Sequence, residues 1–250
     1  MDPALTSDWS SWPAEPRALL DRSCARYGGR PRWLRRRISL TPRVLTGLLP
    51  AWKGMGASFG LPGRIRVEPS AERVVFEDYP GPGAEGIYEA GTVVLLGADQ
   101  REQAREAALR PSFRGLHKLA RWRPLDALYF FGYAIAHYHA VPFTLGEARF
   151  VRQSRWRDLD AVTVVFPPTL HTHSPRQTFY FDADGLIRRH DYVADIVGPW
   201  TPGAHFWRDY TEIDGTVIAR TRHVVARLGR LPTPVTALHA EFTEVSAESL

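Results

Sequence analysis

The sequence predicts an α+β fold in which a curved, partly closed antiparallel β-sheet (an unclosed barrel) wraps around one apolar helix. Short runs rich in Val, Ile, Thr, Phe and Tyr, separated by Gly, Pro and Asp, recur on both sides of a single long apolar segment. That segment, from about Leu125 to Ala140, is hydrophobic nearly all round, which is typical of a helix buried on most sides. The 250 residues contain no repeat and no long linker, so we expect a single domain over residues 1–250.

The first half should contain an N-terminal helix, several short strands and two further helices. The helix is expected over about residues 14–28, because Pro16 stands at an early helical position and Gly28 and Gly29 follow the last apolar residue. Strands are expected between residues 32 and 96, in "WLRRRISLT", "GRIRVEP", "ERVVFEDY", "EGIYEAG" and "TVVLLG". Residues 98–140 should hold a polar surface helix, "DQREQAREAALR", followed by the apolar helix.

The second half, residues 147–246, is expected to return to strands and to contain two hairpins. The Asp-Gly pair in "EIDGTV" favours a type I′ turn, which places Asp209 opposite Arg220 and Trp207 opposite Arg222. In "FDADGL" a turn with a left-handed Gly185 is predicted. The register that we predict for this second hairpin gives one shared face to Gln177, Phe179, Arg189 and Asp191, and the other face to Tyr180, His190 and Tyr192.

Composition argues against several classes of protein. The net charge is +5, but only two of the 32 basic residues are lysines, and such an arginine preference is typical of a GC-rich genome. One dense basic cluster, Arg30 to Arg37, is too little for a nucleic-acid interface, so no nucleic-acid partner is expected. The lone Cys24 excludes an internal disulfide and a cysteine-cluster metal site.

Membrane and cofactor signals are also missing from the sequence. The apolar segment contains Asp126 and is closed by Pro142, so it is too short and too polar to span a membrane. The first residues show no cationic start followed by an apolar run, and we therefore expect a cytoplasmic protein. No GxSxG, GxxxxGK, GxGxxG or HExxH motif in a suitable context is present, so no cofactor is expected. The sequence gives no indication of oligomeric state.

A stripe of polar-tipped side chains runs along the apolar helix. Tyr129, Tyr133 and His137 stand four residues apart and share one face, whereas Tyr138 and His139 fall on other faces. Such stripes are usually core, but buried hydroxyl and imidazole groups need hydrogen-bond partners. We expect the stripe to meet Gln177, Arg189 and Asp191 of the hairpin, with His137, Tyr133 and Asp191 as catalytic candidates and the other three, together with Phe179, as ligand contacts.

Two further groups of residues remain open at this stage. His205, Trp207, Asp209, Arg220 and Arg222 form either a solvated sheet face or a polar cavity wall, and we assign Trp207 and Arg222 to the ligand. His171 and His173 are two apart, the spacing of metal ligands on a strand, with His190, Asp191 or His205 as a third ligand. Prolines from Pro167 to Pro175 indicate a loop instead, and no metal is predicted.

Two features of the sequence resemble known families. A helix ending in "RYGG", followed by a basic strand with a Trp and then many antiparallel strands, resembles the lipoprotein-carrier fold of the LolA and LppX type. That resemblance implies an unclosed antiparallel barrel around helices, with an apolar cavity. The segments "HSPRQTFYFDADGLIRRHDY" and "EIDGTVIARTRHV" are similar to a family of bacterial proteins of about this length that has no established activity.

We expect the protein to hold an apolar, oxygen-bearing small molecule between the curved sheet and the buried helix. One hypothesis is a cofactor-free cyclase, isomerase or hydrolase, in which His, Tyr and Asp exchange protons with the substrate. The alternative is a non-catalytic carrier or sensor of a lipophilic ligand. The number of titratable candidates favours the enzyme, because a carrier needs few of them at its cavity wall.

Overall fold

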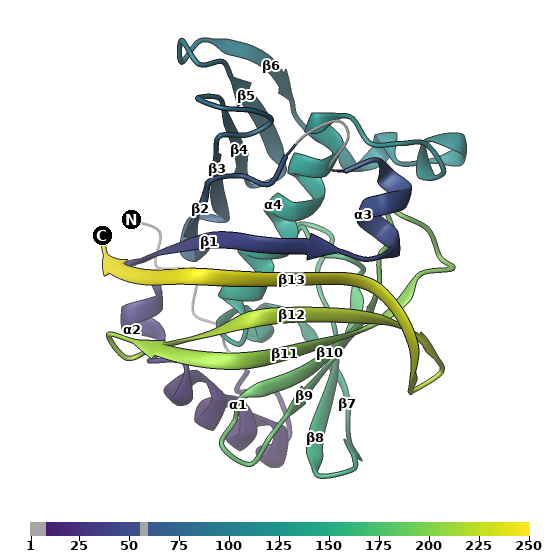
Figure 1. Ribbon diagram of the computed structural model, residues 1–250. Helices are drawn as coiled ribbons and strands as arrows, with labels where there is room; N and C mark the ends of the chain where they lie inside the picture. The colour runs from purple at the N-terminus through teal and green to yellow at the C-terminus, as the bar shows by residue number, and fades with distance from the viewer. Residues whose placement is uncertain (1–8, 56–59) are drawn as a thin grey trace.

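A single antiparallel sheet dominates the computed structural model, which describes residues 9–55 and 60–250 and contains thirteen strands in that part of the chain (Figure 1). The strands are β1 (Arg36–Thr46), β2 (Arg64–Glu68), β3 (Arg73–Glu77), β4 (Glu85–Glu89), β5 (Thr92–Leu96), β6 (Glu102–Glu106), β7 (Arg149–Trp156), β8 (Leu159–Val165), β9 (Arg176–Phe181), β10 (Ile187–Val193), β11 (Pro202–Ile213), β12 (Thr216–Leu228) and β13 (Leu231–Ser249).

The sheet consists of two meanders that join at the ends of the chain. Strands β1 to β6 and strands β7 to β13 each follow sequence order, and β13 pairs with β1 from Arg36 opposite Ser249 to Thr46 opposite His239. The outer strands β6 and β7 do not pair with each other, so the sheet curves without closing (Figure 1). This confirms the predicted α+β class with an unclosed antiparallel sheet.

The helices are α1 (Ala14–Arg26), α2 (Arg30–Trp33), α3 (Leu48–Lys53) and α4 (Pro124–Ala140), with single 3₁₀ turns at Pro69–Ala71, Arg110–Ser112, Gly115–Lys118 and Phe143–Glu147. Helix α4 is the predicted apolar helix. It connects the two meanders, passes behind β1 and β13 in Figure 1, and packs against β2, β3, β4 and β5. Gly132 permits this close approach, because a Cβ added there would lie 2.3 Å from the Cβ of Tyr88 on β4.

Helix α1 covers a different part of the sheet. Its Leu19 and Leu20 belong to a buried cluster that includes Phe181 and Ile187 at the β9–β10 turn. Helices α1 and α4 therefore cover different strands, and no continuous layer of helix covers the part of the sheet between them.

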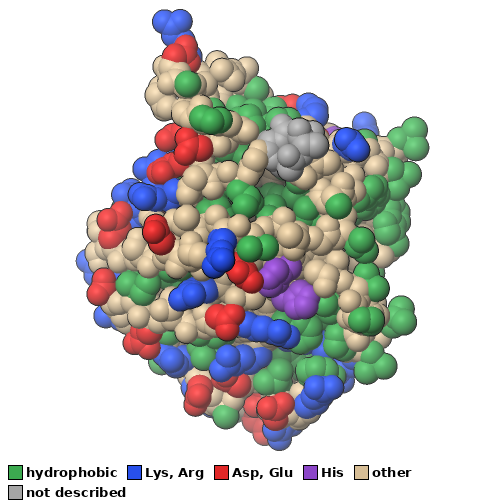
Figure 2. All heavy atoms as spheres, in the orientation of Figure 1, with side chains coloured by type: hydrophobic (Ala, Val, Ile, Leu, Met, Phe, Trp, Pro, Cys, Tyr) green, Lys and Arg blue, Asp and Glu red, His purple; other side chains and the backbone are tan. Residues whose placement is uncertain are grey.

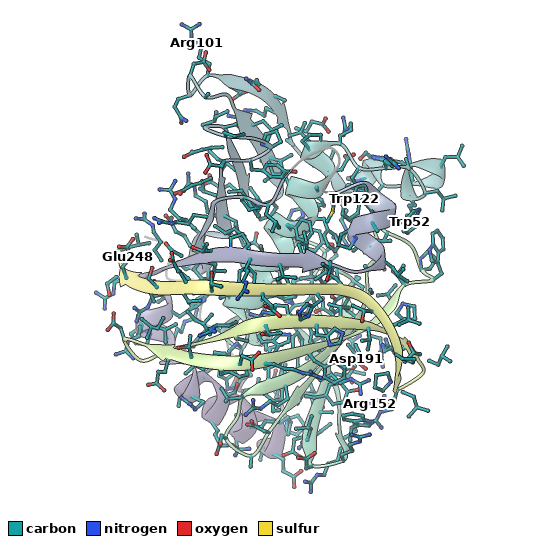
Figure 3. All side chains as sticks on the ribbon, in the orientation of Figure 1. Trp52, Arg101, Trp122, Arg152, Asp191 and Glu248 are labelled. Atoms are coloured by element: carbon teal, nitrogen blue, oxygen red, sulfur yellow. The ribbon has the colours of Figure 1, made fainter. Side chains whose placement is uncertain are left out.

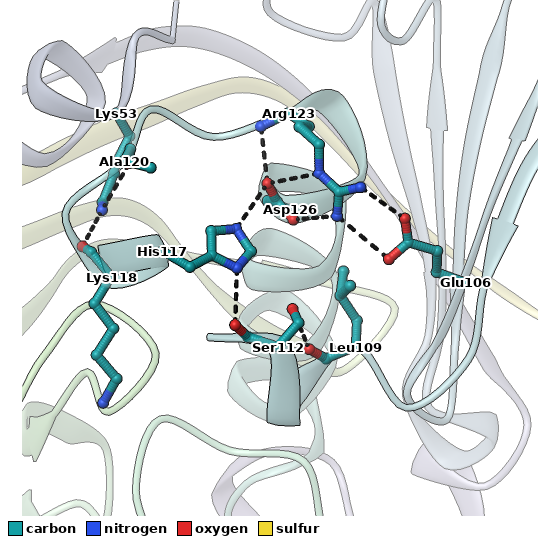
Figure 4. A network of polar contacts seen from close by, with 9 residues as sticks. All are labelled: Lys53, Glu106, Leu109, Ser112, His117, Lys118, Ala120, Arg123 and Asp126. Carbon is teal, nitrogen blue, oxygen red and sulfur yellow. Dashed lines mark hydrogen bonds and ion pairs between the residues drawn. The ribbon is translucent and has the colours of Figure 1, made fainter. Parts of the chain in front are cut away.

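A polar network fixes the first turn of α4 (Figure 4). The carboxylate of Asp126 is fully buried and accepts hydrogen bonds from the backbone N–H and the guanidinium of Arg123, both at 2.9 Å. Burial opposes ionisation, but the contacts with Arg123 and His117 outweigh it and lower the pKa of Asp126. Arg123 also pairs with Glu106 of β6 at 2.9 Å, so the network ties the helix to the edge of the sheet.

Lys53 anchors α3 to the loop before α4. Its ammonium group donates to the carbonyls of Lys118 and Ala120, and it lies between the rings of Trp52 and Trp122, which Figure 3 labels. Burial lowers the pKa of Lys53 to about 8. Because each N–H finds a carbonyl or a ring face, the buried amine positions α3 beside α4.

The register predicted for the last hairpin is confirmed. Ile213 pairs with Thr216, and Trp207 pairs with Arg222. Asp209 lies in register with Arg220, but it adopts a φ of +52° and its side chain bonds to Thr221. The alternation of faces is interrupted there, so Asp209 is exposed whereas His205 and Trp207 are buried.

One element predicted for the first half was wrong, and one strand begins later than predicted. The segment predicted as a polar helix contains β6, an edge strand whose Leu95–Ala104 pairing with β5 overrides the helix propensity of its Gln, Glu and Ala residues. The strand predicted at "WLRRRISLT" is present as β1, but it begins three residues later, at Arg36, because Trp33 closes the one-turn helix α2.

Candidate functional site

A cavity of about 500 Å³ lies between α4 and the concave face of the sheet. Its walls are almost entirely apolar and come from α3, α4, β1, β12 and β13, with residues such as Leu49, Phe130, Ala134, Val224 and Phe242. This volume is that of a small-molecule site. The apolar lining indicates a ligand whose main contact with the protein is hydrophobic.

The cavity opens at the edge of the molecule that carries α3. The lining residues on that side are exposed, with Leu48 at 62% and Trp200 at 55%, and Trp52, Leu61 and Val235 accompany them. Hydrophobic side chains gather along this edge in the space-filling view (Figure 2). Single exposed apolar residues are ordinary, but a ring of them around a cavity marks an entrance for an apolar ligand.

The other end of the cavity is polar. Tyr138 and His139 reach it from α4, and three residues reach it from the sheet: Tyr192, His205 and Arg222. The ring of Tyr138 lies 4.7 Å from that of His205, centroid to centroid. Tyr138 of α4 also lies beside Tyr192 of β10, with the hydroxyls 3.3 Å apart, and beside the guanidinium of Arg222 of β12.

Arg222 is the most unusual residue of this polar end. Its side chain is 5% exposed, and among the described residues no acidic group and no hydrogen-bond acceptor partners its guanidinium. The guanidinium lies 3.9 Å from the ring centre of Trp207 and 5.4 Å from that of Tyr138. Such cation–π contacts contribute about 2 kcal/mol, less than the several kcal/mol that desolvating an unpaired ion costs. Burial accordingly lowers the pKa of Arg222.

His205 is equally short of partners. The ring is fully buried, and neither of its nitrogens has a hydrogen-bond partner among the described residues. Burial, with a contribution from the charge of Arg222, holds the pKa of His205 well below its ordinary value. A neutral imidazole offers one donor and one acceptor, so His205 adds hydrogen-bonding capacity but no charge to this end of the cavity.

The polar stripe of α4 faces β9 and the segment before it, and does not line the cavity. The hydroxyl of Tyr129 bonds to His171 at 2.9 Å, that of Tyr133 to His173 at 3.0 Å, and His137 donates to Gln177 at 3.2 Å. The predicted meeting with Gln177 therefore occurs. None of these stripe residues is among the described residues that line the cavity.

The other hairpin candidates do not meet the stripe, because the predicted register of the β9–β10 hairpin was wrong. The hairpin and its left-handed Gly185 (φ +86°) are as predicted, but the register shifts between Ile187 and Arg189. The shift pairs Arg189 with Tyr180 and His190 with Phe179, so Arg189 and Asp191 lie on the opposite face from Gln177 and Phe179.

Arg189 and Asp191 instead form a buried ion pair on the outer face. Arg189 donates to both carboxylate oxygens of Asp191, at 2.6 and 2.9 Å, and to the carbonyl of Arg230 at 2.7 Å. Its guanidinium is covered by the rings of Trp156 and Tyr180. The two charges neutralise each other, and Nε and one terminal nitrogen of Arg189 are hydrogen-bonded within the protein, so this pair is accounted for as a structural element.

His190 takes the inward place that the sequence prediction gave to Arg189 and Asp191. It donates to Gln177 at 2.6 Å and stacks on Phe179, with ring centres 4.2 Å apart. Burial keeps its pKa well below the ordinary value. Phe179 and Trp207 are both buried core residues. Trp207 does not line the cavity, but its ring packs against the guanidinium of Arg222, which does.

His173 is a residue that the sequence prediction left without a role. Its two ring nitrogens bond to Tyr133 and Tyr138, at 3.0 and 2.5 Å, and burial holds its pKa well below the ordinary value. The two-residue spacing of His171 and His173 was the available signal, because it directs both rings toward α4. Tyr138 and Tyr192, whose hydroxyls lie 3.3 Å apart, connect this layer to the cavity.

Comparisons with known proteins bear on the fold. Neither a protein-family model nor a curated protein sequence matches the chain. Among solved structures, a LolA superfamily protein from Nitrosomonas europaea superposes with a TM-score of 0.50 at 9% identity, covering 94% of each chain. A DUF1329 family protein from Desulfovibrio piger gives a TM-score of 0.46 at 13% identity over 92% of each chain.

The fold resembles that of the LolA superfamily. This confirms the predicted likeness at the level of fold, and at such identity it extends no further.

Two further features of the described residues concern metals and membranes. No group of three or more His, Cys, Asp or Glu side chains in residues 9–55 and 60–250 is placed to hold a metal ion. Within the same ranges, none of the helices combines the length and hydrophobicity that crossing a bilayer requires.

Proposed function

We propose that this protein binds a lipophilic small molecule in the cavity between α4 and the sheet, as a carrier or sensor of that ligand. The observation that carries the proposal is the cavity itself, about 500 Å³ of apolar space that opens through a ring of exposed hydrophobic side chains. An apolar ligand transferred from water into such a space gains about 25 cal/mol for each Å² of surface that it buries. The likeness in fold to a LolA superfamily protein agrees with this proposal.

Binding is favoured over catalysis by the placement of the titratable groups. An enzyme of the kind considered above needs an acid and a base that converge on one ligand position. Asp191 is neutralised by Arg189 on the outer face, and His137 and Tyr133 are bonded to Gln177 and His173 away from the cavity lining. Among the described residues, the groups that do line the polar end include no carboxylate.

The test is binding of a neutral fluorescent probe, N-phenyl-1-naphthylamine, whose emission rises in apolar surroundings. We expect saturable binding to the full chain and displacement by long-chain alcohols. Filling the cavity from either wall, with Ala134→Phe on α4 or Ala226→Trp on β12, should weaken probe binding at least tenfold, because the apolar space is lost.

The matched control is Ala107→Trp, which adds the same bulk at an exposed position outside the cavity lining. It should bind the probe as the unaltered protein does. Undiminished binding by both cavity variants, with folding verified by circular dichroism, would place the ligand elsewhere and overturn the proposal.

A further inference from the structure

The polar end of the cavity has one uncompensated positive charge. Arg222 is buried there with no acidic partner among the described residues. The paired Arg189 on the outer face shows how this chain satisfies an arginine that has a structural role, with two bonds to a carboxylate and one to a carbonyl. Arg222 is almost as deeply buried and lacks each of these contacts, so no partner for it is present among the described residues.

The surroundings of Arg222 define the charge of that partner. Tyr138, His139, Tyr192 and His205 line the same end of the cavity, and burial keeps all four neutral by raising the pKa of each tyrosine and lowering that of each histidine. One negative charge therefore balances the site. The unpartnered ring nitrogens of His205 supply a hydrogen bond beside it.

The remaining wall defines the rest of the ligand. From Arg222 the cavity continues along β12 to Ala226, four residues on, about 13 Å at the rise of a β-strand. Ala226 pairs with Gly203, which follows closely after the exposed Trp200 of the entrance. The path from the charge to the entrance is bordered by apolar side chains, as an aliphatic chain requires.

We propose that the ligand is a long-chain carboxylic acid whose carboxylate is bound by Arg222 and whose aliphatic chain extends toward the entrance beside Trp200. The inference rests on the proposed binding function and adds the class of ligand. A planar guanidinium matches a carboxylate with two parallel hydrogen bonds. A phosphate monoester carries between one and a half and two negative charges, more than this single cation neutralises.

A small neighbouring void does not remove the need for a partner. Arg222 and Trp207 also border a space of about 20 Å³ on the side of Tyr27 and Arg36. That space has room for about one water, which satisfies one donor of the five on a guanidinium and supplies no charge.

The experiment is isothermal titration calorimetry of the full chain with dodecanoate, dodecanol and dodecyl phosphate at pH 8. Dodecanoate should bind about 10- to 100-fold more tightly than dodecanol, the range expected for a buried charge-assisted contact. Arg222→Met should abolish this preference by weakening dodecanoate binding about 10- to 100-fold, and should change dodecanol binding much less. Arg222→Lys keeps the charge without the planar fork and should retain part of the preference.

Arg220→Met is the matched control, because Arg220 is an exposed arginine on the same strand. It should preserve the preference for dodecanoate, which separates an effect at the site from a change in net charge. If Arg222→Met does not fold, the three probes on the unaltered protein and the Arg222→Lys variant decide the question.

The possible failures are distinguishable. If neither dodecanoate nor dodecanol binds, the proposed function falls together with this inference. If dodecanoate and dodecanol bind equally to the unaltered protein, or if Arg222→Met weakens the binding of both equally, the cavity binds lipophilic molecules but Arg222 does not bind a carboxylate. Tighter binding of dodecyl phosphate than of dodecanoate would overturn the assignment of the head group.

Discussion

Two buried arginines of this protein differ in what surrounds them, and the difference is measurable in the absence of ligand. Arg189 forms an ion pair with Asp191, whereas Arg222 has ring faces as neighbours and no acid among the described residues. Arg189→Met leaves the carboxylate of Asp191 buried without its main partner, and should lower the free energy of unfolding by about 3 kcal/mol. Arg222→Met removes a desolvated charge, and should leave that free energy unchanged or raise it.

Urea unfolding of the two variants at pH 7, followed by circular dichroism, checks this comparison. A loss for Arg222→Met as large as that for Arg189→Met would make Arg222 a structural residue and would remove the reason for assigning it a ligand.

At the scale of elements, turn residues and apolar periodicity predicted the turns and the core helix. They failed where the conformation or the register depends on pairing with another strand. The Asp-Gly turn was sufficient to predict that Trp207 pairs with Arg222. The register shift after Ile187 has no comparable signature in the sequence, and this one extra residue exchanged the faces of Arg189, His190 and Asp191. The strand β6 was missed because its residues are good helix formers, and only pairing with β5 makes them extended.

The contact of α4 with β4 gives a prediction at this scale. Gly→Ala inside a helix normally stabilises by about 0.5–1 kcal/mol. At Gly132 the added Cβ would lie 2.3 Å from the Cβ of Tyr88, which is attached directly to the backbone of β4, so helix or strand must move. Gly132→Ala should therefore destabilise the protein by about 1–3 kcal/mol.

Thermal unfolding measures the change, with Gly81→Ala as the control. A Cβ at Gly81 meets no atom within 4 Å, so that variant should be close to neutral. An increase in melting temperature for Gly132→Ala would show that α4 and β4 are not packed as closely as described.

At the scale of the molecule, the cavity is a consequence of how two meanders share one curved sheet. Helix α4 packs on β2 to β5, and α1 packs near the β9–β10 turn. The concave face of β12 and β13 is covered by neither helix completely, and the cavity lies there. The composition of the strands predicts a curved sheet, but the volume that remains depends on curvature and on the position of α4, which no local pattern encodes. Arg222 was recognised as a candidate because the turn fixes its strand pairing. Tyr138, Tyr192 and His139 were not assigned to a ligand, because their place at the cavity depends on the position of α4.

The closed interior also predicts how stability depends on pH. Burial lowers the pKa of His137 to about 4 and that of His139 to about 3, from 6.5 for the unperturbed group. Below pH 6.5 the unfolded chain takes up a proton at each position while the folded protein does not, so unfolding becomes more favourable as the pH falls. Each of these two histidines should cost about 2 kcal/mol of stability at pH 5 relative to pH 7.

Urea unfolding of the ligand-free protein at pH 7 and pH 5 measures this loss, and His137→Gln isolates one contribution. The variant cannot bind a proton at this position in either state, so its loss between the two pH values should be smaller by about 2 kcal/mol, whatever its absolute stability. His173, His190 and His205 are shifted in the same direction, and they should steepen the fall for protein and variant alike. Equal stability at pH 7 and pH 5 would mean that these histidines take up protons in the folded protein, and would contradict the burial that the structure gives them.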